Sequence, residues 1–161
     1  MAAYWLTSKT PIGPPTSANP TLVSLLYAGL VTGAWSGLIS LLILGIAALA
    51  RGPFDAARTP ESPVMAIPWF MVFLVPLAAA LVGAALSGLL LGRRHARRIV
   101  FWVGTLIAIA SCAGPLVQPA SVPWSTRIVL LLMHIVTWFL VVPQIARIVG
   151  DAEPGMSVER E

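Results

Sequence analysis

Four long apolar runs, separated by short polar segments, dominate the sequence. No Asp, Glu, Lys or Arg occurs between Thr10 and Ala50, and the other charge-free runs cover 64–92, 99–118 and 128–146. A helix needs about 20 apolar residues to cross the hydrocarbon core of a bilayer. Barrel strands would instead alternate apolar and polar residues. The pattern predicts an all-α integral membrane bundle of four transmembrane helices, with spans at about 21–50, 64–92, 99–118 and 128–147.

The segments outside these runs predict the rest of the organisation. Residues 1–20 contain four prolines and one charge, and predict a flexible tail because each proline removes a backbone donor and restricts φ. The segment 51–63 reads as a polar loop, compatible with one short interfacial turn around 54–58. The acidic segment 150–161 predicts a disordered tail. One transmembrane domain, 21–149, lies between the two tails.

Composition supports a surface that meets lipid. Charged residues make up 10% of the chain and hydrophobic residues 58%, whereas a soluble domain carries about 25% charged residues. The net charge of +4 is concentrated in the link between the second and third runs and is not spread over a soluble face. We therefore expect no nucleic-acid partner, and anionic lipid headgroups at the inner face. A homo-oligomer or a membrane-protein partner stays open.

The same basic link predicts the orientation of the bundle. By the positive-inside rule it faces the cytoplasm, which places both termini in the cytoplasm of a multi-pass cell-membrane protein (N-in/C-in). Seven basic residues then lie inside and three outside. The residues expected to set topology and meet headgroups are Arg93, Arg94, Arg97, Arg98 and Arg147. Gln144, one turn before Arg147, is expected to anchor the fourth span at the interface.

Small residues four apart predict how the helices associate. In lipid, close backbone contact replaces the hydrophobic effect as the reason for helices to pack. Gly29, Gly33 and Gly37 form such a stripe on the first span, and Gly88 belongs to one on the second. The third span carries a similar stripe and the fourth has none. Whether these faces meet a neighbour in the same chain or a second copy is left open.

His134 is the one ionisable side chain well inside a predicted span, apart from the single cysteine. Such residues are functional candidates by default. It follows Arg127 by seven residues, about 10 Å below the outer boundary, and Ser111 falls at a similar depth, about 12 Å below it. We expect a polar cluster in the outer half of the bundle that binds a ligand or, alternatively, holds the helices together: Ser40, Ser111, Cys112, His134 and Thr137.

The missing residue types restrict the chemistry. No carboxylate lies in any predicted span, which disfavours coupled carriers and small multidrug exporters. A single membrane histidine and a single cysteine disfavour a bis-histidine haem within one chain and a quinone-linked thiol oxidoreductase. No Ser-His-Asp set, HExxH or phosphate loop occurs. We expect no catalytic residues, no metal site and no cofactor, so an enzyme is the weakest interpretation.

The stretch from Trp102 to Ile148 resembles a family of small four-span membrane proteins of unknown function from high-GC Gram-positive bacteria. The likeness is carried by Ser111-Cys112-Ala113-Gly114-Pro115-Leu116, by Leu132-Met133-His134-Ile135-Val136 and by Val142-Pro143. The resemblance implies a four-helix fold and brings no activity with it.

Two functional interpretations follow from these patterns. The first is a non-catalytic accessory, assembly or lipid-organising protein that acts through helix–helix contacts. The alternative is a binding protein or carrier for a small apolar or amphipathic molecule, with His134 as its polar contact.

Overall fold

The computed structural model describes residues 20–52, 54–57 and 61–154. Within these ranges four helices are long and apolar enough to cross a membrane: Leu22–Arg51, Trp69–Leu90, Ala96–Leu116 and Trp124–Asp151. The prediction of an all-α bundle of four transmembrane helices is thereby confirmed. Predictions for residues 1–19 and 155–161 fall outside the described part of the chain.

Helix α2 (Leu22–Arg51) begins at a capping box. The Thr21 hydroxyl accepts from the Ser24 backbone N–H at 3.3 Å, and the Ser24 hydroxyl accepts from the Thr21 N–H at 2.8 Å. Two amide groups that the first turn leaves unpaired are thereby satisfied. The helix ends at Gly52, whose φ of 88° is in the region that favours glycine.

Helix α3 (Trp69–Ser87) starts directly after Pro68 and continues through Pro76. It tightens into the short 3-10 helix η1 (Gly88–Leu90). The link to the next helix is compact, since Gly92 and His95 both have positive φ, 72° and 63°. Few residues other than glycine adopt positive φ, and histidine is, with Asn and Asp, among those that do so more often. The turn therefore lies inside the basic segment.

The third span differs from the predicted 99–118. Helix α4 (Ala96–Ser111) starts within the basic segment, so that Arg97 and Arg98 are helical, and it is interrupted at Cys112 before the four-residue α5 (Ala113–Leu116). Pro115 explains the interruption, because its ring cannot coexist with a regular hydrogen bond to the Ser111 carbonyl four residues earlier.

The fourth span is longer than predicted at both ends. Helix α6 (Trp124–Asp151) starts directly after Pro123 and continues past Arg147. Residues 150–151, assigned to a disordered tail from sequence, are its last residues. The prediction failed there because a polar composition does not reveal the contacts that order a helix end.

The polar loop between α2 and α3 contains a short hairpin in place of the interfacial turn. Strands β1 (Asp55–Ala56) and β2 (Met65–Ala66) pair antiparallel, with Asp55 opposite Ala66 and Ala56 opposite Met65. Phe54 and Ala57, which flank β1, are buried. The hairpin covers one end of the bundle.

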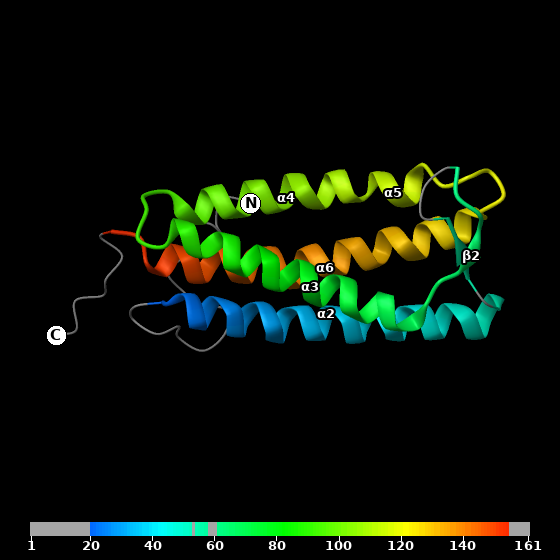
Figure 1. The fold of residues 1–161 in the computed structure, drawn as a ribbon, viewed down its shortest axis with the longest axis horizontal. Helices are drawn as coiled ribbons and strands as arrows, with labels where there is room; N and C mark the ends of the chain where they lie inside the picture. The colour runs from blue at the N-terminus through cyan, green and yellow to red at the C-terminus, as the bar shows by residue number, and fades with distance from the viewer. Residues whose placement is uncertain (1–19, 53, 58–60, 155–161) are drawn as a thin grey trace.

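The four long helices lie side by side along one axis (Figure 1). Helix α6 lies between α2 and α4, and α2 forms its most extensive interface with α3. Both described ends of the chain and the 91–95 link lie at one end, called here the arginine-rich end, and the β1–β2 hairpin and the 117–123 link lie at the other, the hairpin end. The buried core is concentrated toward the arginine-rich end: Leu25, Ala80, Ala84, Ala96, Val100, Val141, Ile145, Ala146, Ile148 and Val149.

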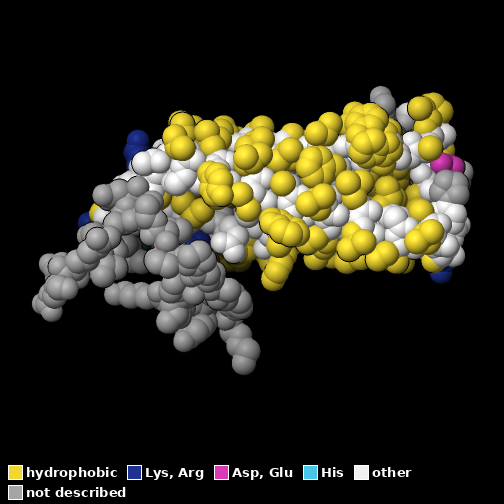
Figure 2. Space-filling model, turned by 90° about the horizontal axis from the view of Figure 1, so that it is seen from below, with side chains coloured by type: hydrophobic (Ala, Val, Ile, Leu, Met, Phe, Trp, Pro, Cys, Tyr) yellow, Lys and Arg dark blue, Asp and Glu magenta, His cyan; other side chains and the backbone are white. Residues whose placement is uncertain are grey.

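The outer wall is apolar along the length of the bundle. Figure 2 shows hydrophobic side chains between the two ends of one face, with the charged side chains visible there confined to the ends. Large apolar side chains such as Leu49, Leu89 and Val23 are exposed. In water such a surface would aggregate, so it is suited to hydrocarbon.

Candidate functional site

The three glycines of the first span lie against α3. A Cβ atom added to Gly29 would lie 2.8 Å from the Ala84 Cβ, and one on Gly33 would lie 2.8 Å from the Ala80 Cβ. A Cβ on Gly37 would lie 2.8 Å from the Phe73 carbonyl oxygen. These distances leave no room for a side chain. The glycine stripe is thus used by a helix of the same chain.

Gly88 lies at the arginine-rich end of the same interface. A Cβ there would lie 2.7 Å from Leu22 Cδ1, the far end of a flexible side chain. Gly104 allows α4 to approach α6 closely in the same way, because a Cβ there would lie 2.9 Å from Val142 Cγ1. Two interfaces of the bundle therefore depend on small residues.

One part of the predicted polar cluster lies between α2 and α6. The Ser36 and Thr137 hydroxyl oxygens are 2.8 Å apart, and the Thr137 hydroxyl donates to the Met133 carbonyl at 2.9 Å. Since Thr137 has one proton and it is used on Met133, Ser36 is the donor to Thr137. Ser40 lies one turn along α2, fully buried, and its hydroxyl has no hydrogen-bond partner in the described chain.

This pair of hydroxyls makes a modest, measurable contribution to the bundle. Thr137→Val removes the acceptor of a buried hydroxyl, and we expect a loss of about 1 kcal/mol in the free energy of unfolding, since such bonds between membrane helices average about 0.6 and reach about 1.7 kcal/mol. Unfolding in mixed SDS–maltoside micelles measures it. Thr137→Ser keeps the hydroxyl and is expected to unfold close to the wild type, and an equal loss in both variants would contradict the assignment.

The other part of the cluster lies between α4 and α6. The Trp138 Nε1–H donates to the Thr105 hydroxyl at 3.0 Å. Beside this contact is a recess of about 230 Å³ whose lining includes Cys112 and His134. His134 Nδ1 lies 2.7 Å from the Leu130 carbonyl. Because a carbonyl oxygen only accepts, Nδ1 is the donor of this hydrogen bond.

The structure thus divides the five predicted residues instead of gathering them. Thr137 lies at the α2/α6 interface, Ser40 is buried on α2 one turn from Ser36, and Cys112 and His134 line the α4/α6 recess. Ser111 is exposed and donates to the Ala108 carbonyl of its own helix at 2.7 Å. Matching depths indicated one cluster, but α2 and α4 pack on different sides of α6 (Figure 1). Depth along a helix carries no information on which side a residue faces.

Two polar side chains for which the sequence pattern predicts no site, Arg127 and Gln118, organise the hairpin end. Arg127 is buried, and its guanidinium donates to the carbonyls of Leu116 at 2.9 Å, Pro119 at 2.8 Å and Val122 at 3.3 Å. It also lies 4.8 Å from the centre of the Trp124 ring. The sequence marks Arg127 only as a residue at the outer boundary of the fourth span, although the unpaired carbonyls of a helix end before it are a signal for such a donor.

Gln118 joins the same end to the hairpin. Its side-chain amide accepts from the Ala57 N–H at 2.8 Å and donates to the Ala57 carbonyl at 3.0 Å. The amide thereby pairs with a backbone residue as a neighbouring strand would. Arg127 and Gln118 together tie the 117–123 link and β1 to the end of α5.

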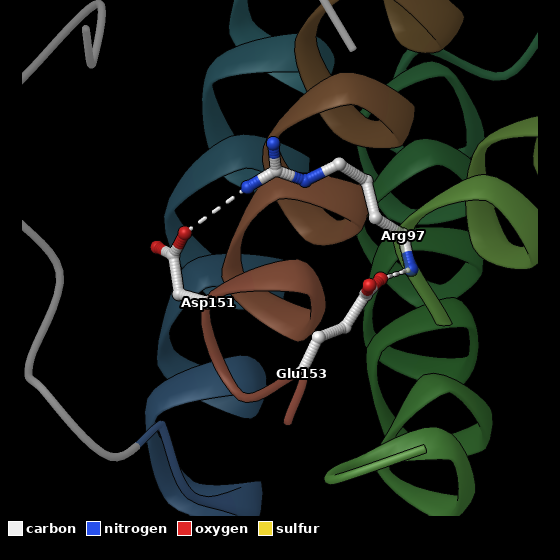
Figure 3. Close-up of polar contacts among 3 residues, drawn as sticks. All are labelled: Arg97, Asp151 and Glu153. Atoms are coloured by element: carbon white, nitrogen blue, oxygen red, sulfur yellow. Dashed lines mark hydrogen bonds and ion pairs between the residues drawn. The ribbon is translucent and has the colours of Figure 1, made fainter. Parts of the chain in front are cut away.

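At the arginine-rich end, the basic residues differ in their surroundings. Arg93, Arg94 and Arg98 are exposed, whereas Arg147 and Arg97 are half-buried. The Arg97 guanidinium contacts Asp151 at 3.1 Å, and its backbone N–H donates to the Glu153 carboxylate at 2.8 Å (Figure 3). Arg97 therefore joins the start of α4 to the end of α6 within the protein. This also gives the reason why α6 is ordered to Asp151.

The ion pair is expected to contribute little by itself. Asp151→Asn should lower the free energy of unfolding by about 0.5 kcal/mol at low salt and less at high salt, because partly exposed pairs are weakened by solvent and ions. Unfolding curves at two salt concentrations test this. Glu61→Gln, which removes an exposed carboxylate at the other end, is the control and should change neither curve. A loss that is independent of salt would contradict an ionic contribution.

A second and larger hollow, called here the α2/α6 groove, lies at the arginine-rich half of the interface between α2 and α6. It measures about 480 Å³, and its lining is mostly apolar, with Gln144 among its polar members. In the described part of the chain, no group of three or more His, Cys, Asp or Glu side chains could hold a metal ion.

These features define a membrane-spanning four-helix protein with two lateral hollows and tightly bonded ends. Residues 20–151 match the family model described as "Family of unknown function (DUF6069)", and the chain belongs to that family. The match covers all four spans, a wider range than the Trp102–Ile148 stretch on which the resemblance rested. Searches among curated proteins and among solved structures gave no match.

Proposed function

We propose that this protein is a non-catalytic membrane protein that organises lipid around a rigid bundle of helices. The observation that carries the proposal is the 480 Å³ groove between α2 and α6. Its volume is within the range of about 300–1,000 Å³ typical of small-molecule sites, and it opens on the wall of the bundle between exposed Tyr27 and Trp35. A hollow in that place is accessible to lipid chains.

The internal bonding of the bundle supports the same proposal. Hydroxyl and indole groups within the spans are joined across the helices, Ser36 with Thr137 and Thr105 with Trp138. Arg127 is held by three backbone carbonyls. Such a bundle offers a fixed outer surface, and a fixed surface lowers the entropic cost of binding a molecule in a groove.

The exposed arginines extend the proposal to the membrane surface. Arg93, Arg94 and Arg98 project from the link between η1 and α4 and from the start of α4, and each basic residue near an anionic surface contributes about 1 kcal/mol of attraction. We propose that this end faces the cytoplasm of a cell membrane, with both termini on that side. The proposal gives Arg97 a smaller part in this attraction, because its guanidinium pairs with Asp151.

Cysteine accessibility tests the orientation. In a Cys112→Ser background, Asp55→Cys and Arg94→Cys place exposed thiols at the hairpin end and the arginine-rich end. An impermeant reagent added to intact cells is expected to label position 55 and to reach position 94 only after lysis. Labelling of both positions in intact cells would overturn the four-span arrangement, and labelling of position 94 alone would reverse the orientation.

Native mass spectrometry of the protein extracted gently from its membrane tests lipid organisation. We expect a chain that retains phospholipid and lacks a stoichiometric protein partner. The same experiment distinguishes lipid organisation from an assembly role. In an assembly role, the exposed face of α4 with Trp102, Leu106 and Ile109 would contact a protein partner. Recovery of one partner in fixed ratio, with no retained lipid, would overturn the lipid-organising function.

The α4/α6 recess favours a second candidate, a binding protein or carrier for a small molecule. His134 lines this recess, and its Nε2 atom makes no hydrogen bond within the described chain, but the recess of about 230 Å³ is below the usual range of ligand sites. His134→Leu tests this candidate. A small molecule that co-purifies with the wild type and is lost from the variant, with unfolding unchanged, would support this candidate. If the same small molecules co-purify with both proteins, the candidate is excluded.

A further inference from the structure

The α2/α6 groove has the length and position of one leaflet. Its lining on α2 runs from Ser24, beside the helix start, to Trp35. Eleven residues of helix rise about 16 Å, close to half of a hydrocarbon core about 30 Å thick. The groove therefore begins at the membrane surface of the arginine-rich end and stops near the middle of the bilayer.

Apolar and polar groups are arranged along this groove as they are along a lipid. Val31 and Trp35 on α2 and Leu140 on α6 line its deeper part. Tyr27 lies nearer the surface and is 68% exposed, a placement that suits its amphipathic ring. Thr32, which also lines the groove, uses its hydroxyl on the Ala28 carbonyl at 2.7 Å and offers no free donor.

Gln144 is a polar group of the groove to which the described chain provides no hydrogen-bond partner. Its half-buried side chain makes no hydrogen bond to any residue that the structure describes. It precedes Arg147 by three residues, about 4.5 Å along the helix, which places it just below the headgroup level. The amide is accessible from the groove, and its two N–H donors suit an ester carbonyl.

We propose that this groove binds one acyl chain of a diacyl glycerophospholipid from the leaflet at the arginine-rich end. The Gln144 amide donates a hydrogen bond to the ester carbonyl of that chain. Tyr27 borders the headgroup, and Val31, Trp35 and Leu140 contact the hydrocarbon. This inference rests on the proposed lipid-organising function and adds to it the site, the leaflet and the chemical group recognised.

The site is tested by blocking the groove. The full chain is reconstituted with dioleoyl phosphatidylglycerol, extracted in mild detergent and measured by native mass spectrometry for bound lipid per chain. We expect one retained lipid in the wild type and at least a tenfold lower retention in Val31→Trp, which fills the groove. Val103→Trp, an equal enlargement of an exposed valine on α4, is the matched control and should retain lipid.

Recognition of the ester is tested separately. The diether analogue of the same lipid lacks the carbonyl, and we expect at least a fivefold weaker retention of it by the wild type. Gln144→Leu should bind the diester and the diether equally. Ala28→Phe provides a second way to fill the groove, and unfolding curves identify any variant that has lost its fold.

Each outcome separates the site from the broader function. Equal lipid retention by the wild type, Val31→Trp and Ala28→Phe would overturn the groove as the site, while lipid organisation would stand. Equal retention of diester and diether by the wild type would overturn the role of Gln144. A lipid-free dimer that Val31→Trp disrupts would show that a second copy occupies the groove, and absence of bound lipid from every form would overturn the proposed function as well.

Discussion

Gly33→Ala should destabilise the bundle by about 2 to 3 kcal/mol, the upper part of the range for overpacking a tight interface. The added methyl would lie 2.8 Å from the Ala80 Cβ and 2.9 Å from the Leu77 Cα, and neither atom belongs to the flexible end of a side chain. Helices α2 and α3 must therefore move apart. Their separation would weaken the most extensive interface of the bundle, and unfolding in mixed micelles should report it.

Gly45→Ala is the matched control for this experiment. Gly45 lies in the same helix, and a Cβ there meets nothing within 4 Å. Since glycine inside a helix costs roughly 0.5–1 kcal/mol relative to alanine, this variant should unfold at the same or slightly higher denaturant. Both variants replace a glycine by alanine. Gly33→Ala is expected to lower the free energy of unfolding, whereas Gly45→Ala should leave it unchanged or raise it slightly. Equal effects would show that the α2/α3 contact is looser than described.

Arg127→Met should have an effect of similar size, about 3 kcal/mol. Methionine keeps much of the side-chain volume but leaves the carbonyls of Leu116, Pro119 and Val122 without their shared donor. Hydrogen bonds to charged groups contribute about 1.5–3 kcal/mol, and buried acceptors left unpaired add a desolvation cost. The 117–123 link should also lose order, which amide hydrogen exchange measures as faster exchange at the hairpin end.

Two controls separate the carbonyl contacts from the charge. Arg51→Met removes an exposed arginine at the same end and should change the unfolding free energy by less than about 0.5 kcal/mol. Arg127→Lys keeps the charge, but a single ammonium group cannot reproduce the planar fork of donors, so it should fall between wild type and Arg127→Met. An Arg127→Met protein that unfolds like the wild type would contradict this assignment.

The hydrophobic pattern predicted the elements that depend on local composition and on the solvent. Four runs without charges became four helices because a backbone in hydrocarbon must satisfy its own hydrogen bonds. The glycines of α2 also predicted a close helix–helix contact, since residues four apart share one face of a helix. The pattern did not identify the neighbour, and only the structure assigns the stripe to α3.

Boundaries were predicted less well where a proline or a distant contact decides them. The break at Cys112 follows from Pro115, which was visible in the sequence, but Pro76 and Pro143 are equally visible and interrupt nothing. Asp151 is helical because Arg97, 54 positions away, pairs with it. Composition alone indicated disorder there.

The candidate site shows most clearly what sequence and tertiary structure each determined. The sequence alone established a membrane-spanning all-α chain and the basic end of the bundle, and it predicted similar depths for His134, Ser111 and Ser40, because these depend on hydropathy and helical rise. The direction in which each residue faces depends on how helices rotate and pack. Tertiary structure therefore decided that α2, which carries Ser40, and the recess lined by His134 lie on different sides of α6, that Arg127 is bonded to three carbonyls, and that Gln144 borders a groove.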